Sequence, residues 1–305
     1  MSPYLHYAKY VRSSSFDVLS SNVSAWLDES TGSLAPVRCH SHNDYLRPHP
    51  LFSALAAGCI GVEADVFLSD DGQDLLIGHD RASLSNDKTL RSMYLSPLLE
   101  MLRHRNPGGV QQSHNSSINQ TGQGIYRMSP QTSLVLLIDV KEKPDVVWPM
   151  VIRQLEQLRD GRFLTRYETL AETGSTLLSG ALTVVGSGDL DLDTLIAAYG
   201  ARPLNANRSF YGAHDTFLDA PLTSLEAGGP GNYGTSNSYY ASTSFQASVG
   251  SARFGLSNEQ RRKVRAQVHT ARQKGLMARY WGYPAGRSAT ATTSGAPCGK
   301  KAWSC

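Results

Sequence analysis

Short apolar runs and helix-like patterns alternate along most of this chain. Runs typical of strands occur at residues 35–39, 60–67, 75–78, 134–140, 182–186, 209–212, 238–242 and 276–281. Segments with helical periodicity occur at residues 51–57, 97–104, 145–159, 192–199 and 258–274. Strands that alternate with helices are typical of an α/β fold with a parallel sheet.

The segment 60–67 places two carboxylates on one side of a predicted strand. Because side chains alternate along a strand, Glu63 and Asp65 point one way and the apolar residues around them point the other. Two like charges on one face repel each other unless a cation or a proton lies between them. Their hard oxygen atoms suit Mg²⁺ or Ca²⁺ better than Zn²⁺. A half-exposed strand with a polar face gives the same pattern, but the polar strand ends on both sides favour a metal site.

Two histidines lie at the ends of predicted strands. His42 belongs to the motif His-Ser-His-Asn-Asp-Tyr, and His79 to the motif Gly-His-Asp. Cleavage of a phosphodiester needs one group that takes a proton from the attacking oxygen and another that gives a proton to the leaving oxygen, and imidazole titrates near neutrality. We therefore predict that these two histidines are the acid and the base. His40 faces the same side as His42, and we expect it to bind a ligand carboxylate or the substrate.

The apolar run 134–140 predicts a strand buried on both faces, with a charged end. Asp139 is the predicted third carboxylate of the metal site. Lys141 lies two residues later, on the same face, where its ammonium can bind a phosphate as a point charge. An alternative role for Asp139 is to cap the helix that begins near Pro144.

The composition and net charge of the chain argue against nucleic-acid binding. The chain has 305 residues, of which 40% are hydrophobic and 18% charged, as in an ordinary α/β domain. The net charge is only +3, and no basic helix, zinc-finger spacing or aromatic RNA-binding motif is present. We therefore expect no nucleic-acid partner.

The motifs at these positions resemble those of one known family. His-x-His-Asn-Asp-Tyr, a Pro-Leu-x-x-Ala-Leu helix, Gly-x-x-x-Val-Glu-Ala-Asp-Val, Leu-Leu-x-Gly-His and Ile-Asp-Val-Lys follow in the order seen in the fungal altered inheritance of mitochondria protein 6 family. That family lies in the phospholipase-C-like phosphodiesterase superfamily, with the glycerophosphodiester phosphodiesterases and the spider-venom type phospholipases D. The resemblance covers residues 36–284, and its first half is the more specific.

The resemblance implies a TIM (β/α)8 barrel whose site combines a divalent cation with two catalytic histidines. The cation would be held by an E-x-D pair and a third carboxylate. Carried over by position, the site residues are Glu63, Asp65, Asp139, His42 and His79. Lys141 resembles the lysine that follows the third carboxylate in the venom-type enzymes.

Three segments are expected to lie outside the regular barrel. Residues 285–305 depart from the family pattern and have no hydrophobic period, so we predict a disordered tail and a barrel, over residues 36–284, that lacks its last helix and strand. Residues 1–35 are polar and are predicted to be irregular. Residues 104–131, rich in Asn, Gln, Ser and Gly, are predicted to form a flexible insertion.

Several residues near the strand ends are candidates for substrate binding. Asn43 is next to His42, and Ser187 lies in a Gly-Ser-Gly sequence whose small residues allow a phosphate to approach the backbone. Tyr240 and Trp281 are candidates for an aromatic wall. An ordinary turn and ordinary core aromatics would give the same patterns.

The sequence leaves the cellular compartment open. Residues 1–35 contain no apolar run of the length of a membrane span or a signal peptide core, so we expect no transmembrane segment. Sequons at Asn22, Asn115, Asn119 and Asn207, and the family resemblance, leave a secretory or a mitochondrial compartment open. The four cysteines form no C-x-x-C pair, and whether any of them form a disulfide is undetermined.

The sequence as a whole predicts a phosphoric diester hydrolase that uses Mg²⁺, or Ca²⁺, and histidine acid/base catalysis on a glycerophosphodiester or a (lyso)phospholipid. One alternative is a catalytically impaired member of the same fold that binds a phospholipid headgroup or a protein. Another is a metal-dependent hydrolase of a different ester, which the E-x-D pair disfavours because such enzymes more often use histidine-rich metal ligands.

Overall fold

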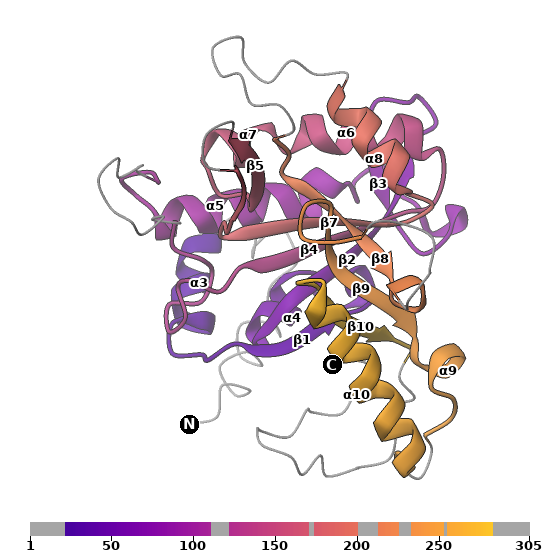
Figure 1. Cartoon of the computed structure of the whole chain (residues 1–305). Helices are drawn as coiled ribbons and strands as arrows, with labels where there is room; N and C mark the ends of the chain where they lie inside the picture. The colour runs from indigo at the N-terminus through magenta and orange to yellow at the C-terminus, as the bar shows by residue number, and fades with distance from the viewer. Residues whose placement is uncertain are drawn as a thin grey trace.

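A parallel sheet of seven strands forms the centre of the computed structural model, which describes residues 22–110, 122–170, 174–200, 213–225, 233–252 and 255–282 (Figure 1). Neighbouring strands are parallel throughout the order β1-β2-β4-β7-β8-β9-β10. Their bounds are β1 (Val37–Ser41), β2 (Cys59–Leu68), β4 (Leu134–Val140), β7 (Leu182–Gly188), β8 (Thr216–Pro221), β9 (Ser238–Ser244) and β10 (Met277–Trp281). The short strand β3 (Leu75–Ile77) pairs with β2 in the antiparallel direction.

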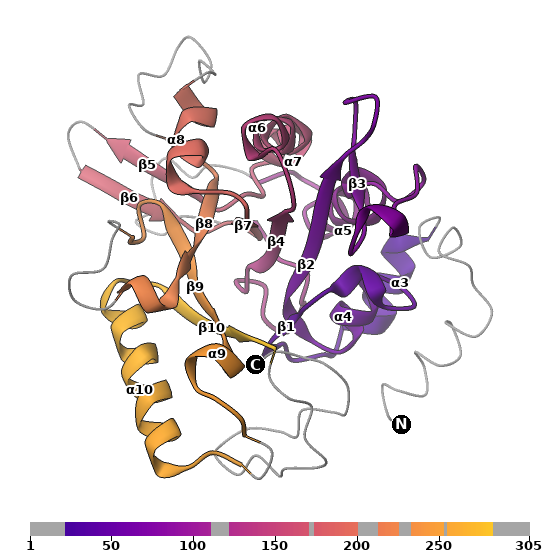
Figure 2. The same ribbon diagram turned by 90° about the vertical axis from the view of Figure 1, so that its right-hand side faces the viewer.

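The sheet curls, so that strands distant in this order face each other. Arg279 of β10 reaches Glu63 of β2, with 2.5 Å between nitrogen and oxygen, although β10 and β2 are not neighbours. Strands β1 and β10 are the two ends of the order, and no pairing joins them in the described part of the chain. Both views place them near each other (Figure 2). The TIM-type α/β architecture predicted from the sequence is confirmed, in the form of a half-barrel.

Helices cover the outer face of the curled sheet (Figure 2). They are α3 (Val23–Thr31), α4 (Phe52–Ala56), α5 (Ser96–Arg105), α6 (Pro144–Gln154), α7 (Glu156–Asp160), α8 (Leu192–Gly200), α9 (Phe245–Ser248) and α10 (Asn258–Gln273). The apolar face of β2, with Val62, Ala64 and Val66, is fully buried in one cluster with Trp148 of α6. The opposite face of β2 carries the carboxylates into the barrel interior. None of the described helices has the length and apolar character needed to cross a membrane.

Helix α3 corrects the prediction that residues 1–35 are irregular. Trp26 and Leu27 are almost fully buried, and the ring of Trp26 packs edge-on against Phe52, with 4.7 Å between centroids. The helix has only nine residues, which is too short to be stable by itself, so packing of its buried face against the barrel stabilises it. Residues 1–21 lie outside the described residues.

The sequence pattern also missed elements in the second half. Strand β8 at Thr216–Pro221 was not predicted, whereas the predicted strand at 209–212 lies outside the described residues. A separate hairpin of β5 (Arg166–Leu170) and β6 (Gly174–Leu178) was not predicted either. The predicted disordered tail, residues 285–305, is likewise outside the described residues.

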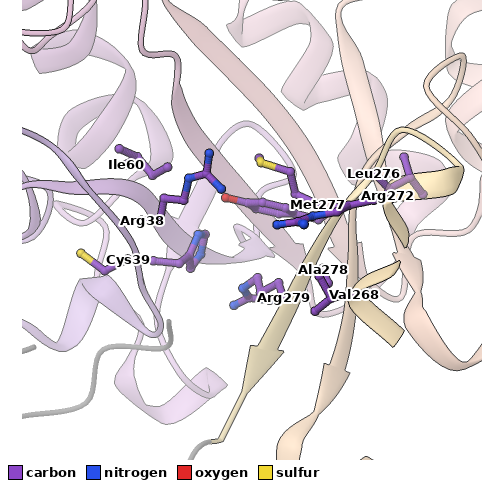
Figure 3. A pocket seen from close by; sticks show the side chains of 11 residues that line it. Arg38, Cys39, Ile60, Val268, Arg272, Leu276, Met277, Ala278 and Arg279 are labelled. Carbon is purple, nitrogen blue, oxygen red and sulfur yellow. The ribbon is translucent and has the colours of Figure 1, made fainter. Parts of the chain in front are cut away.

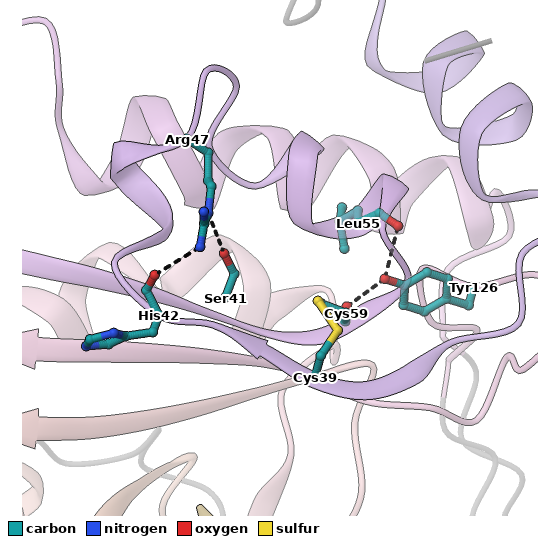
Figure 4. Close-up of a disulfide and its surroundings, with 7 residues drawn as sticks. All are labelled: Cys39, Ser41, His42, Arg47, Leu55, Cys59 and Tyr126. Atoms are coloured by element: carbon teal, nitrogen blue, oxygen red, sulfur yellow. Dashed lines mark hydrogen bonds between the residues drawn. A yellow bond between two sulfur atoms is a disulfide. The ribbon is translucent and has the colours of Figure 1, made fainter. Parts of the chain in front are cut away.

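The predicted flexible insertion at 104–131 is in part a core segment. Residues 111–121 are outside the described residues, but Ile125 and Tyr126 are both 1% exposed. The hydroxyl of Tyr126 donates a hydrogen bond to the backbone oxygen of Cys59, with 2.6 Å between the oxygens (Figure 4). This end of the insertion is therefore anchored beneath β2.

Candidate active site

Strand pairing brings the three predicted metal ligands together. In the parallel pair β2 and β4, Asp65 lies opposite Asp139, and Glu63 lies one alternation earlier on the same face. One carboxylate oxygen from each of the three residues lies within 4.8 Å of the others. Asp139 belongs to strand β4, and helix α6 is capped by Lys143, so the capping role considered for Asp139 does not apply.

Lys141 supplies the positive charge nearest to two of these carboxylates. Its Nζ lies 2.9 Å from Oδ2 of Asp65 and 2.9 Å from Oδ2 of Asp139. Burial alone would lower the pKa of Lys141, but these contacts outweigh burial and raise the pKa above its ordinary value. Lys141 is therefore charged at neutral pH, as its predicted role toward a phosphate requires.

The carboxylate group has the properties of a cation site. Burial raises the pKa of Glu63 to about 8, although Arg279 opposes the change, and burial also raises the pKa of Asp65. Oδ1 of Asp65 and Oδ1 of Asp139 are buried and accept no hydrogen bond within the described residues. Buried carboxylate oxygens without partners are costly unless a cation binds them. The three carboxylates can therefore hold a metal ion, and their hard oxygen atoms fit Mg²⁺ or Ca²⁺.

His42 lies on the Glu63 side of this group, at the end of β1. Its Nε2 is 3.8 Å from Oε1 of Glu63, and its ring stacks on Trp281 with 6.5 Å between centroids. Burial lowers the pKa of His42 to about 4, and the charge of Arg279 acts in the same direction. A side-chain contact holds this turn, since the guanidinium of Arg47 donates a hydrogen bond to the backbone oxygen of His42 (Figure 4).

His79 lies on the Asp65 side, just after β3. Its Nδ1 is 3.9 Å from Oδ2 of Asp65 and 3.0 Å from the hydroxyl oxygen of Tyr45. The hydroxyl of Tyr45 donates its one hydrogen to Asp65, at 2.8 Å, so in the contact with His79 it is the acceptor. Nδ1 of His79 then carries the ring proton, which leaves Nε2 as a proton acceptor on a side chain that is 59% exposed.

His40 is buried below His42. Its ring lies over Gly61, where any side chain would collide with it, and packs edge-on against Tyr240, with 5.8 Å between centroids. Nε2 of His40 is 3.7 Å from Oε2 of Glu63, which is longer than a hydrogen bond. Burial holds the pKa of His40 well below its usual value. Its predicted role as a ligand-binding residue stays a prediction.

The candidate substrate-binding residues lie at different depths. Ser187 of β7 is opposite Asp139 in the strand register, and Asn43 follows His42 in a left-handed backbone conformation, with φ of 48°. Trp281 is 41% exposed at the end of β10, whereas Tyr240 is buried beneath His40. Ser187 therefore lies next to Asp139 and Trp281 next to His42, Tyr240 lies deeper, and the predicted role of Asn43 stays a prediction.

Three polar residues of the site were not predicted from the sequence. Arg279 is 7% exposed, and its guanidinium contacts Glu63 and also Asp219 of β8, at 3.5 Å. Tyr45 contacts Asp65, as described above. Alternation along the predicted strand at 276–281 puts Arg279 on the same face as Trp281, and this signal would have identified it. Asp219 lies in the strand that the sequence pattern missed.

The family model and the similar proteins all identify the same family. The family model described as the AIM6-like phosphodiesterase domain matches residues 28–204. The altered inheritance of mitochondria protein 6 homolog of Arthroderma benhamiae is 33% identical over 83% of this chain and 75% of its own length. The altered inheritance of mitochondria protein 6 of Lachancea thermotolerans is 32% identical over 81% of this chain and 57% of its own length.

The Saccharomyces cerevisiae protein of that name, from strain YJM789, is 35% identical over 63% of this chain. The chain spans 46% of that protein's length, and less than two thirds of several other relatives. No solved structure matches the chain.

Proposed function

We propose that this chain, which belongs to the AIM6-like phosphodiesterase family, is a metal-dependent phosphoric diester hydrolase. The observation that carries the proposal is the group of three carboxylates, Glu63, Asp65 and Asp139, with a histidine on each side. A phosphodiester needs charge compensation at its non-bridging oxygens and proton transfer at its two reacting oxygens, and this arrangement supplies groups for both.

The metal would be held by Glu63, Asp65 and Asp139. A bound Mg²⁺ would orient the phosphate and offset the negative charge that develops on its oxygens. Lys141 adds a second positive charge beside Asp65 and Asp139, and Ser187 offers a hydroxyl next to Asp139. These side chains would fix the phosphate between the two histidines.

His79 and His42 would divide the proton transfers between them. Nε2 of His79 is free to accept a proton, since Nδ1 is directed at Tyr45, and its exposure gives water or a substrate hydroxyl direct access. His42 is neutral at pH 7, because burial lowers its pKa to about 4, so a histidine on each side of the carboxylates is placed to exchange a proton with one of the two reacting oxygens. Trp281 stacks on His42 and would hold its ring in position.

Glycerophosphodiesters and lysophospholipids are the substrate class that we propose. Both carry the phosphodiester that the carboxylates, Lys141 and the histidines would bind. The exposed face of Trp281 beside His42 offers an apolar surface for the group attached to the phosphate.

The test is hydrolysis of a panel of glycerophosphodiesters and lysophospholipids with Mg²⁺, measured for the wild type and for single variants. His42→Ala and His79→Ala should each slow turnover by roughly 10² to 10⁴, the usual loss for a general acid or base. His269→Ala, an exposed position on α10, is the matched control and should keep full activity. Unchanged turnover in either site variant would show that the histidines do not act as proposed.

A second candidate function is phospholipid-headgroup or protein binding without turnover. It is favoured by the contacts of Lys141, whose ammonium already compensates both Asp65 and Asp139. Isothermal titration with glycerophosphocholine, in Mg²⁺ and in EDTA, separates the two functions. Binding that is equal in both conditions, together with no product formation over hours, would favour the non-catalytic function.

A further inference from the structure

A cavity of about 220 Å³ lies between the two ends of the curled sheet (Figure 3). Arg38 and His40 of β1 line one side, and residues of β10 and α10 line the other. Because β1 and β10 do not pair in the described part of the chain, the cavity occupies the gap that their edges leave. Glu63, Asp65 and Asp139 are not among its lining residues.

Two arginines enter the cavity from opposite sides. Figure 3 shows the side chain of Arg38 coming from β1 and that of Arg272 from α10, both directed to the middle of the cavity. Neither guanidinium has an ion pair or a hydrogen bond with any described residue. Two like charges that face one gap without a carboxylate between them favour an anion there.

A third arginine reaches the cavity from inside the barrel. Arg279 lines it, is 7% exposed, and uses its terminal nitrogens for Glu63 and Asp219. Its Nε is buried and has no hydrogen-bond partner within the described residues. A buried donor without a partner costs free energy, and an oxygen atom of a ligand in the cavity would satisfy it.

The remaining wall of the cavity is apolar. It includes Ile60, Val268, Leu276, Met277 and Ala278, together with Cys39 and the ring of Tyr240. A bare inorganic anion would leave this wall in contact with water, whereas an alkyl chain would cover it. The cavity thus combines guanidinium groups with an apolar surface.

We propose that this cavity binds a phosphate monoester that carries an apolar chain. A phosphate monoester has a charge close to −2 at neutral pH and three oxygens, so it can be shared by two facing guanidinium groups. Arg38 and Arg272 hold the phosphate, Arg279 donates from below, and the chain lies on the apolar wall. The proposal does not rest on the proposed hydrolytic activity, because Asp65, Asp139 and His79 do not line the cavity, although Arg279 also contacts Glu63.

The test is isothermal titration of the full chain in EDTA, which removes the cation through which the carboxylate site would hold a phosphate. The probes are octyl phosphate, inorganic phosphate and octyltrimethylammonium. We expect octyl phosphate to bind at least ten times more tightly than inorganic phosphate, and the cationic probe not to bind.

Single variants assign the binding to this cavity. Arg38→Gln and Arg272→Gln change exposed side chains that have no ion pair or hydrogen bond with a described residue, so both should fold, and each should raise the dissociation constant of octyl phosphate about ten-fold. Arg262→Gln, on the same helix but not lining the cavity, is the charge-matched control and should have no effect.

Equal binding of inorganic and octyl phosphate would overturn the role of the apolar wall and assign the cavity to free phosphate. Absence of octyl phosphate binding, or binding that neither arginine variant weakens, would overturn the proposal altogether.

Discussion

The disulfide between Cys39 and Cys59 joins β1 to the beginning of β2 (Figure 4). The two cysteines are 20 residues apart in the sequence. The intervening loop contains the turn that carries His42 and Tyr45, and β1 is an end strand with a single neighbour. We expect that loss of this disulfide destabilises the barrel and loosens the strand that presents the histidines.

The length of the loop that the disulfide closes determines how much stability the protein should lose without it. Closing a loop of this size in the unfolded chain removes entropy worth about 3 kcal/mol at 25 °C. With a urea m-value of about 3 kcal/mol/M, the transition midpoint should fall by about 1 M. Both cysteines are buried, so we expect the two thiols to stay packed in the reduced protein and the loss on reduction to come from loop closure.

The assay is urea unfolding followed by tryptophan fluorescence, with and without dithiothreitol. The Cys39→Ala/Cys59→Ala variant should match the reduced wild type to within the small cost of the lost sulfur atoms, and it should not respond to dithiothreitol. Cys298→Ala/Cys305→Ala is the control and should behave as the wild type. If reduction left the wild-type midpoint unchanged, or if the control lost as much stability, the reasoning from loop closure would be refuted.

Three further predictions concern charge and space around the site. Burial raises the pKa of Asp44 to about 6 from an ordinary 3.8, so the protonated carboxyl stabilises the folded state. This contribution to the free energy of unfolding is largest below about pH 4 and is lost as the pH rises through 6. Between pH 4 and 7, urea unfolding should therefore show that the wild type loses about 2 kcal/mol relative to Asp44→Asn, and a parallel pH dependence of the two proteins would contradict this. Lys141→Met leaves Asp65 and Asp139 uncompensated, so in EDTA the stability should fall by about 3 kcal/mol, and the rise in melting temperature on adding Mg²⁺ should exceed that of the wild type. An equal or smaller rise would show that Lys141 does not compete with a cation. Gly188→Ala places a methyl group against Oδ1 of Asp139 at a φ of 74°, so it should cost more than about 1 kcal/mol and reduce the Mg²⁺-induced rise. Gly108→Ala, with nothing within 4 Å, is its control, and equal melting curves for the two variants would contradict the prediction.

The sequence predicted the site best where one strand carries both the pattern and the chemistry. Alternation along β2 places Glu63 and Asp65 on one face whatever the tertiary structure, and the apolar run before Asp139 predicts a neighbouring buried strand. The parallel register then brings Asp65 and Asp139 opposite each other. These residues could be predicted because local periodicity alone determines their orientation.

Prediction failed where contacts distant in sequence decide the structure. Helix α3 depends on Trp26 packing against Phe52, and β8 is a short strand whose edges are both paired by other strands. Helix α3 has nine residues and β8 has six, and in segments this short tertiary packing determines the conformation. Asp219, which lies in β8 beside Arg279, was missed for the same reason.

The contact between Arg279 and Glu63 bears on the order of folding. The two residues are 216 positions apart, so closing this contact in a disordered chain would cost about 5 kcal/mol of loop entropy. Strands β1, β2 and β4 can assemble the carboxylates from a much shorter stretch of chain, so we expect β10 to dock in a late step of folding. Because that step also brings Trp281 against His42, local detachment of β10 would open the site while the rest of the barrel stays folded.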